Sequence, residues 1–177
     1  QGRTLAGQKQ PQPRWKRCVN RVDRHLGEAL GQVYVEQYFT ADTRARTLRM
    51  VQQIEKAMED DIAGLAWMSA ETKAQALEKL RGVTNKIGHP ERWRDYSTVA
   101  IAANDYYGDA TRAMAFEVNR QLSKIGKPLV RGEWYLTPPS VNANYDAQMN
   151  EINFPAGVLQ PPAFDPKNGT VTAGTSS

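Results

Sequence analysis

In several stretches between about residues 14 and 124, apolar side chains recur every three or four positions, the spacing of an amphipathic helix. Four helices are predicted from this pattern, at about 14–39, 42–68, 69–82 and 104–124. Asp42 is a candidate N-cap of the second helix. The third helix is expected to begin at Ser69, with Glu71 in its first turn, and to stop at Gly82. The stretch from Ile87 to Pro90 is predicted as a turn. Because each helix carries an apolar stripe, the four helices are expected to pack together as the core.

The helical spacing ends at Pro128, and the chain after it is rich in Pro, Gly and Asn. Two short strands are predicted at 141–145 and 151–154, separated by a turn. The stretch 154–162 contains too many Pro and Gly residues for a helix or a strand. The predicted fold class is therefore mainly α: a helical subdomain of about four helices, then a short β-hairpin and a Pro-rich segment. The domain boundary is predicted to separate residues 1–128 from 129–177.

Composition narrows the class of protein. The chain has 177 residues, of which 40% are hydrophobic and 24% charged, which is ordinary for a globular protein. Its net charge of +4 comes largely from an early basic stretch, which fits a solvated helix face. No zinc-finger, RNA-binding or helix-turn-helix pattern accompanies this stretch, so nucleic acid is not an expected partner. No apolar run approaches the ~20 residues of a transmembrane segment. The first residues contain neither Met nor a signal-peptide pattern, which predicts a chain that begins inside a longer gene product.

Residues that could hold a metal are few. His25 and Glu28 lie three positions apart on one helical face, but zinc needs three or four ligands and no second histidine is near. A structural or solvent-facing role is favoured for His25, and a surface role for His89. The single cysteine, Cys18, excludes an internal disulfide, and its position on an apolar stripe predicts a buried, inert thiol. With no nucleophile elbow or phosphate-binding loop either, neither catalytic residues nor metal ligands are predicted.

The segment around Asn142 and Ala143 suits an edge strand, with exposed backbone groups and a small side chain. Such a strand can pair with an extended peptide by β-augmentation. The alternative is an edge strand covered by the rest of the fold, and the residues of this strand by themselves favour that alternative.

Residues 141–164 also resemble the neprilysin family of zinc endopeptidases, which includes endothelin-converting enzymes and bacterial oligopeptidases. The resemblance rests on Asn-Ala at 142–143, Asn-x-Ile-x-Phe-Pro-Ala at 150–156 and Leu-Gln-Pro-Pro at 159–162. It extends from about Thr4 to Pro166, through further motifs such as Pro-Arg-Trp at 13–15, Leu-Gly-Glu-Ala-Leu-Gly at 26–31 and Lys-Ile-Gly-Lys-Pro at 124–128.

The resemblance implies roles for four residues. Asn142 and Ala143 match the pair that binds the substrate backbone, and Val158 matches an apolar residue lining the pocket for the residue after the scissile bond. Ala163 stands where the family has an aromatic residue in that pocket. Asn144 likewise replaces a residue that is commonly aromatic.

The family's zinc ligands and catalytic glutamate lie downstream of the matched region, and their His-Glu-x-x-His motif is absent from this sequence. The resemblance therefore implies a fragment of a zinc-dependent metalloendopeptidase that hydrolyses peptides. Residues 129–177 would belong to its catalytic domain and would need the remainder of that domain as a partner. The cofactor of the parent enzyme would be zinc, whereas this chain is expected to bind none and to be inactive by itself.

Two further expectations concern source and alternative function. The lack of disulfides favours a bacterial parent, and the resemblance implies an extracytoplasmic protein that is periplasmic, secreted or lipoprotein-anchored. The alternative function is a non-catalytic helical interaction module.

Overall fold

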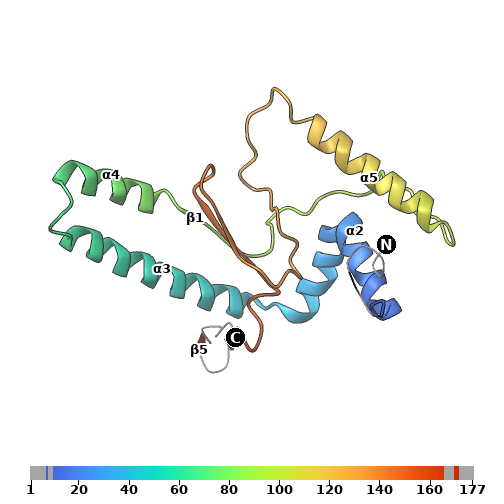
Figure 1. Cartoon of the computed structure of the whole chain (residues 1–177), viewed down its shortest axis with the longest axis horizontal. Helices are drawn as coiled ribbons and strands as arrows, with labels where there is room; N and C mark the ends of the chain where they lie inside the picture. Colours follow the sequence, from blue (N-terminus) through green and yellow to red (C-terminus); the bar gives the residue numbers. More distant parts are fainter. Residues whose placement is uncertain (1–6, 8–9, 166–169, 172–177) are drawn as a thin grey trace. The chain divides into compact units, whose positions relative to one another are not determined.

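The computed structural model describes residues 7, 10–165 and 170–171. Its helices are α2 (Arg14–Tyr38), α3 (Ala41–Gly64), α4 (Ala70–Arg81) and α5 (Tyr106–Leu122) (Figure 1). Its strands are β1 (Thr84–Gly88), β2 (Asn144–Asp146), β3 (Glu151–Pro155), β4 (Phe164–Asp165) and β5 (Thr170–Val171). The predicted mainly α fold with four helices and a β-hairpin is confirmed. Within these described ranges, none of the helices is long and apolar enough to cross a membrane.

The chain forms two compact units, each built from two separate stretches. The first unit contains Gln1–Leu30 and Arg94–Leu129, and the second contains Gly31–Trp93 and Val130–Ser177. The domain boundary expected after residue 128 concerns a larger protein and stays a prediction. Within the present chain, residues 31–93 belong to the same unit as the β-hairpin.

The starts of α3 and α4 are set by hydroxyl caps. Thr40 Oγ1 accepts a hydrogen bond of 3.1 Å from the backbone N–H of Thr43, and Ser69 Oγ accepts one of 3.2 Å from that of Thr72. The predicted start of the third helix at Ser69 is thus confirmed, with Ser69 as its N-cap. The predicted cap at Asp42 is wrong, because Thr40 already has the extended backbone of a cap; Asp42 lies in the first turn, where its charge still favours the helix dipole.

Three strands form a mixed sheet in the order β1-β3-β2. The hairpin of β2 and β3 is antiparallel, as the sequence predicts, with Asp146 opposite Glu151. Strand β1 lies parallel to β3 on its other side and occupies part of the stretch predicted as a turn. Strand β1 was not predicted because its residues do not alternate between polar and apolar. Its last three residues are all buried, and its partner β3 lies far along the chain.

The hydrophobic core lies in the second unit and includes the Pro-rich segment. Its buried members are Phe39, Val51, Ile87, Ala156, Leu159 and Phe164. The expected core of four packed helices is therefore wrong. Helices α3 and α4 do pack on each other, but Ile54 and Met58 on the stripe of α3 remain 60% and 53% exposed. The helical stripes predict amphipathicity correctly but not what each stripe contacts.

Helix α2 departs from prediction in two ways. Its first turns are exposed on all sides, so Cys18 is an exposed free thiol and not the predicted buried one. Leu26 has non-helical backbone angles (φ −136°, ψ 40°), which divide the helix at a kink. The apolar side chains before the kink are exposed, Trp15 by 64%, because no other described part of the chain covers them.

Candidate functional site

The predicted peptide-binding residues lie at an edge of the sheet. Asn142 and Ala143 are exposed and immediately precede β2, which pairs with β3 on one side only among the described residues. The carboxamide oxygen of Asn142 accepts a hydrogen bond of 2.8 Å from the backbone N–H of Ala143. The expected strand therefore begins two residues later than its motif, and no described strand pairs with its outer edge.

The turn after β2 is fixed by side-chain hydrogen bonds. Asp146 Oδ1 accepts from the backbone N–H groups of Gln148 and Met149, at 2.9 and 3.1 Å. Asn150 adopts a positive φ of 51°, accepts from the hydroxyl of Tyr145 and donates to the carbonyl of Lys79 at 2.8 Å. These bonds hold the hairpin in one register and attach its turn to the end of α4.

Val158 and Ala163 lie in the same unit as the hairpin. Val158 is partly buried against the hydrophobic core, and Ala163 is half-buried next to the fully packed Phe164. The backbone N–H of Gly157 donates to the carbonyl of Pro138 at 2.8 Å, so the segment before Val158 is joined to the segment that leads to Asn142. A Cβ atom at position 157 would overlap the carbonyl of Pro139, which explains why glycine is needed at this close approach.

One face of the sheet is polar although it is buried. Lys86 on β1 and Glu151 on β3 form an ion pair with 2.6 Å between Nζ and Oε1, and both side chains are only 7% exposed. Lys86 Nζ also donates to the backbone carbonyl of Glu133 at 2.6 Å. Sequence reasoning missed this pair; the usable signal is that Glu151 and Asn153 alternate with Ile152 and Phe154 along β3.

Three oxygens on this polar face are buried without a hydrogen-bond partner: Glu151 Oε2, Asn153 Oδ1 and Asn144 Oδ1. Asn144 and Asn153 are directly opposite in the hairpin register. The opposite face of the sheet is apolar and contacts α3, through Ile87 and Phe154. The sheet thus separates an apolar layer from a polar cluster around the Lys86 ammonium.

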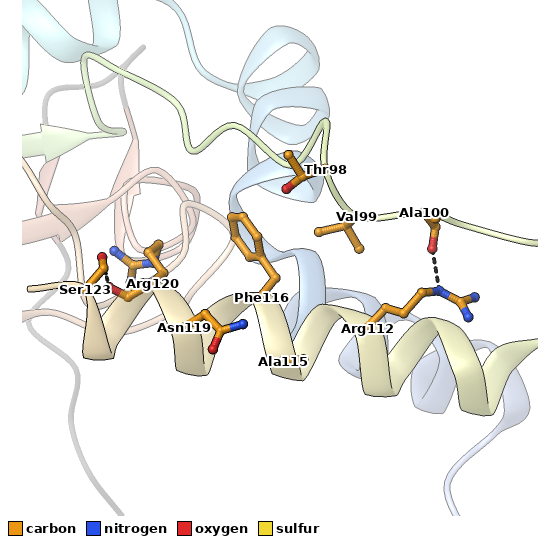
Figure 2. A pocket seen from close by; sticks show the side chains of 9 residues that line it. All are labelled: Thr98, Val99, Ala100, Arg112, Ala115, Phe116, Asn119, Arg120 and Ser123. Atoms are coloured by element: carbon orange, nitrogen blue, oxygen red, sulfur yellow. Dashed lines mark hydrogen bonds between the residues drawn. The ribbon is translucent and has the colours of Figure 1, made fainter.

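The first unit contains an open groove of about 590 Å³ beside α5. Figure 2 shows its walls: Thr98, Val99 and Ala100 on an extended segment, and the side chains of α5 opposite. Arg112 Nε donates to the Ala100 carbonyl at 2.7 Å, and its guanidinium pairs with Asp105 and Asp109. Arg120 pairs with Glu117. Both guanidinium groups therefore form ion pairs within the protein. The rest of the lining is mixed, with Phe116 and Ala115 beside polar residues such as Asn119.

The residues described by the structure contain no group of three His, Cys, Asp or Glu side chains that could hold a metal ion. His25 is partly buried, and this burial, with Arg21 and Arg24 nearby, lowers its pKa. Glu28 does not serve as its co-ligand, because the Glu28 carboxylate accepts hydrogen bonds from Arg94. His89 stacks on Trp93 with 5.4 Å between ring centroids, and its Nδ1 lies 2.9 Å from the Pro90 carbonyl.

Comparison with known proteins gives one family match. The model described as "Peptidase family M13" matches residues 1–90. Endothelin-converting enzyme 1 of Homo sapiens is 36% identical over 86% of this chain and 21% of its own length. The chain therefore spans about a fifth of the length of this curated relative.

Solved structures show the same likeness at the level of the fold. The zinc metalloprotease Zmp1 of Mycobacterium tuberculosis, in complex with an inhibitor, is 44% identical with a TM-score of 0.84, covering 94% of this chain and 25% of that one. PepO from Lactobacillus rhamnosis is 30% identical with a TM-score of 0.82, covering 92% of this chain and 26% of that one.

Proposed function

Because the chain belongs to peptidase family M13, we propose that it forms part of a zinc-dependent metalloendopeptidase and supplies its peptide-binding strand. The observation that carries the proposal is the open edge of β2, with Asn142 and Ala143 exposed directly before it. An extended substrate would add to this edge through backbone hydrogen bonds, while side-chain pockets would select its sequence. The relatives named as a zinc metalloprotease and as an endothelin-converting enzyme support this role.

Asn142 would orient the substrate backbone, since its side-chain amide can both donate and accept a hydrogen bond. Val158 and Ala163 would line the pocket for the residue after the scissile bond. Val158 packs against the hydrophobic core, and the backbone N–H of the preceding Gly157 donates to the Pro138 carbonyl, which would give this pocket a rigid base.

The described residues do not fit a zinc site, so the proposal assigns the metal, and the chemistry of peptide hydrolysis, to other residues of the parent enzyme. The role of this chain is to bind and orient the peptide. The chain by itself is proposed to cleave no substrate.

The proposal extends to a bacterial parent that acts outside the cytoplasm. The 44% identity to the mycobacterial protein and the absence of paired cysteines support it. A non-catalytic interaction module remains the second candidate, favoured by the exposed stripe of Met114, Val118 and Leu122 on α5.

The test uses the full-length enzyme that carries this chain. Wild type should cleave peptides and lose activity when a chelator removes zinc. Asn142→Ala should lower kcat/KM roughly 5- to 150-fold, the effect of losing one hydrogen bond of about 1–3 kcal/mol to the bound peptide. Zinc content and melting temperature should not change.

Asn20→Ala is the matched control, because Asn20 is an exposed residue of α2 whose side-chain amide donates to the side chain of Gln12, at 3.4 Å, on the surface. It should keep wild-type kinetics. A full-length enzyme without peptidase activity would support the interaction module, and wild-type kinetics in Asn142→Ala would remove Asn142 from the site.

A further inference from the structure

The ammonium of Lys86 joins three segments that are far apart in the sequence. It lies on β1, pairs with Glu151 at the start of β3, and donates to the carbonyl of Glu133 in the segment before β2. Position 133 is nine residues before Asn142, and position 151 is nine residues after it. A single buried cation therefore holds both flanks of the loop and strand that carry Asn142 and Ala143.

The buried ion pair of Lys86 and Glu151 should add little to the stability of the fold. An ion pair in the interior loses much of its attraction to the cost of removing both charges from water, and an apolar pair of the same size often stabilises a fold as well. Here Glu151 receives the ammonium on one oxygen only, and its second oxygen is buried without a partner. The pair is therefore a poor source of stability, whereas its geometry fixes where two chain segments lie.

We propose that Lys86 is a positioning residue for the peptide-binding strand, acting through its bonds to Glu151 and to the Glu133 carbonyl. The inference rests on the proposed function, since it assumes that the edge of β2 receives the substrate. Lys86 touches no substrate. It sets the position of Asn142 relative to the rest of the sheet, and a shift of this strand by a fraction of an ångström weakens every backbone bond to the peptide.

The experiment separates charge burial from positioning by using a neutral pair in the full-length enzyme. In Lys86→Met/Glu151→Met both charges are absent, so no uncompensated charge stays buried and the fold should be retained with wild-type zinc content. The bond to the Glu133 carbonyl is lost with the ammonium. We expect KM for a peptide substrate to rise about 10-fold, with kcat changed less than threefold.

Two further variants complete the test. Glu151→Gln keeps the lysine bond to Glu133 and an oxygen acceptor at position 151, so it should raise KM less than threefold in the folded enzyme. It leaves the buried ammonium without its anion, so its melting temperature should fall. Lys73→Met is the matched control: Lys73 Nζ also donates to a backbone carbonyl, that of Ala63 at 2.8 Å, but on the exposed surface of α4. It should have wild-type KM and kcat.

The outcomes are distinct. A folded, zinc-loaded double variant with wild-type KM, tested beside an impaired Asn142→Ala, would overturn the positioning role and leave the proposed function standing. If Asn142→Ala and the double variant both keep wild-type KM, the strand does not bind substrate and the proposed function fails first. Should the double variant not fold, Lys86→Arg decides, because a guanidinium keeps the positive charge but does not reproduce the position of the lysine ammonium. A folded Lys86→Arg enzyme with raised KM supports the inference. A folded Lys86→Arg enzyme with wild-type KM overturns it.

Discussion

Glu28 on α2 receives two hydrogen bonds from Arg94, a residue 66 positions later in the chain. The backbone N–H of Arg94 lies 2.7 Å from Glu28 Oε2, and its guanidinium lies 2.8 Å from Oε1. Glu28 is only 8% exposed, and its own N–H donates to the hydroxyl of Tyr96 at 3.4 Å. This contact attaches the segment after Trp93 to α2 and organises the first unit.

Glu28→Gln should therefore destabilise the chain. A carboxamide can accept one of the two bonds, but its NH₂ group then faces the other donor. The partly buried Arg94 guanidinium loses the charge of Glu28 and keeps Glu117, 3.1 Å from its Nη1, as its ion-pair partner. Breaking a buried ion pair costs about 3–5 kcal/mol, and we expect about 3 kcal/mol because one bond remains. Chemical denaturation measures the change. Glu91→Gln is the matched control: Glu91 is 86% exposed and 3.9 Å from Arg44, so it should cost less than about 1 kcal/mol.

Acid should weaken the first unit through Glu117. The pKa of this carboxyl is held at about 2, against an ordinary value of 4.5. The main cause is its hydrogen bonding to Arg120, and a hydrogen bond from Gln121 and the positive charge of Arg94 also lower it. A pKa lowered by folding contributes stability above the unfolded value, and that stability is lost as the pH falls from about 4.5 toward 2. Glu117→Gln should flatten the pH dependence of the free energy of unfolding in this window. Denaturant titrations between pH 6 and pH 2.5 test this, and an unchanged slope would contradict it.

Gly88→Ala should destabilise the second unit. Gly88 has a φ of +85°, and an added Cβ would overlap the ring of Phe39, a rigid member of the core. Backbone strain of about 1–2 kcal/mol and overpacking of about 1–3 kcal/mol together predict a loss of about 3 kcal/mol. Gly64→Ala provides the comparison, because Gly64 ends α3 with no atom near its Cβ position. Gly64→Ala should leave the stability unchanged or raise it slightly. Thermal unfolding of the two variants beside wild type measures both effects.

Ala163→Phe should change substrate preference in the full-length enzyme. Ala163 is half-buried beside the core, and a phenyl ring would occupy space that the proposed pocket leaves to the substrate. We expect preference after the scissile bond to shift from large apolar residues toward small ones. A peptide series varied only at that position measures it. The same profile in wild type and variant would place Ala163 outside the pocket.

The helices could be predicted because their signals are local. Apolar spacing and a hydroxyl cap such as Ser69 depend on residues within one or two turns, and the observed helices begin close to the expected positions. The hairpin was also predictable, since the Asp146–Asn150 turn carries its own side-chain bonds. For the candidate site, the residue types of Asn142 and Ala143 indicated an edge strand, whereas their expected role in binding substrate came from motif resemblance.

What the sequence did not reveal depends on partners far along the chain. Strand β1 forms because residues 151–155 provide its hydrogen bonds, and nothing within residues 84–88 signals that pairing. Lys86 and Glu151 likewise look like surface charges until the sheet places them together. Cys18 shows the reverse error: an apolar stripe predicts burial, but burial also requires a neighbour, and in the described structure that face has none.

The parallel pairing of β1 with β3 also has a consequence for synthesis on the ribosome. Thr84 pairs with Glu151, 67 positions later, so β1 emerges well before its partner exists. At roughly 5–20 residues per second, the nascent segment waits about 3–13 s without its partner strand, and its backbone groups stay available to pair with another chain. A charged side chain in the middle of a free strand discourages pairing with another nascent chain. Lys86, which later connects β1 to Glu151 on β3, would thus first protect β1 from aggregation during translation.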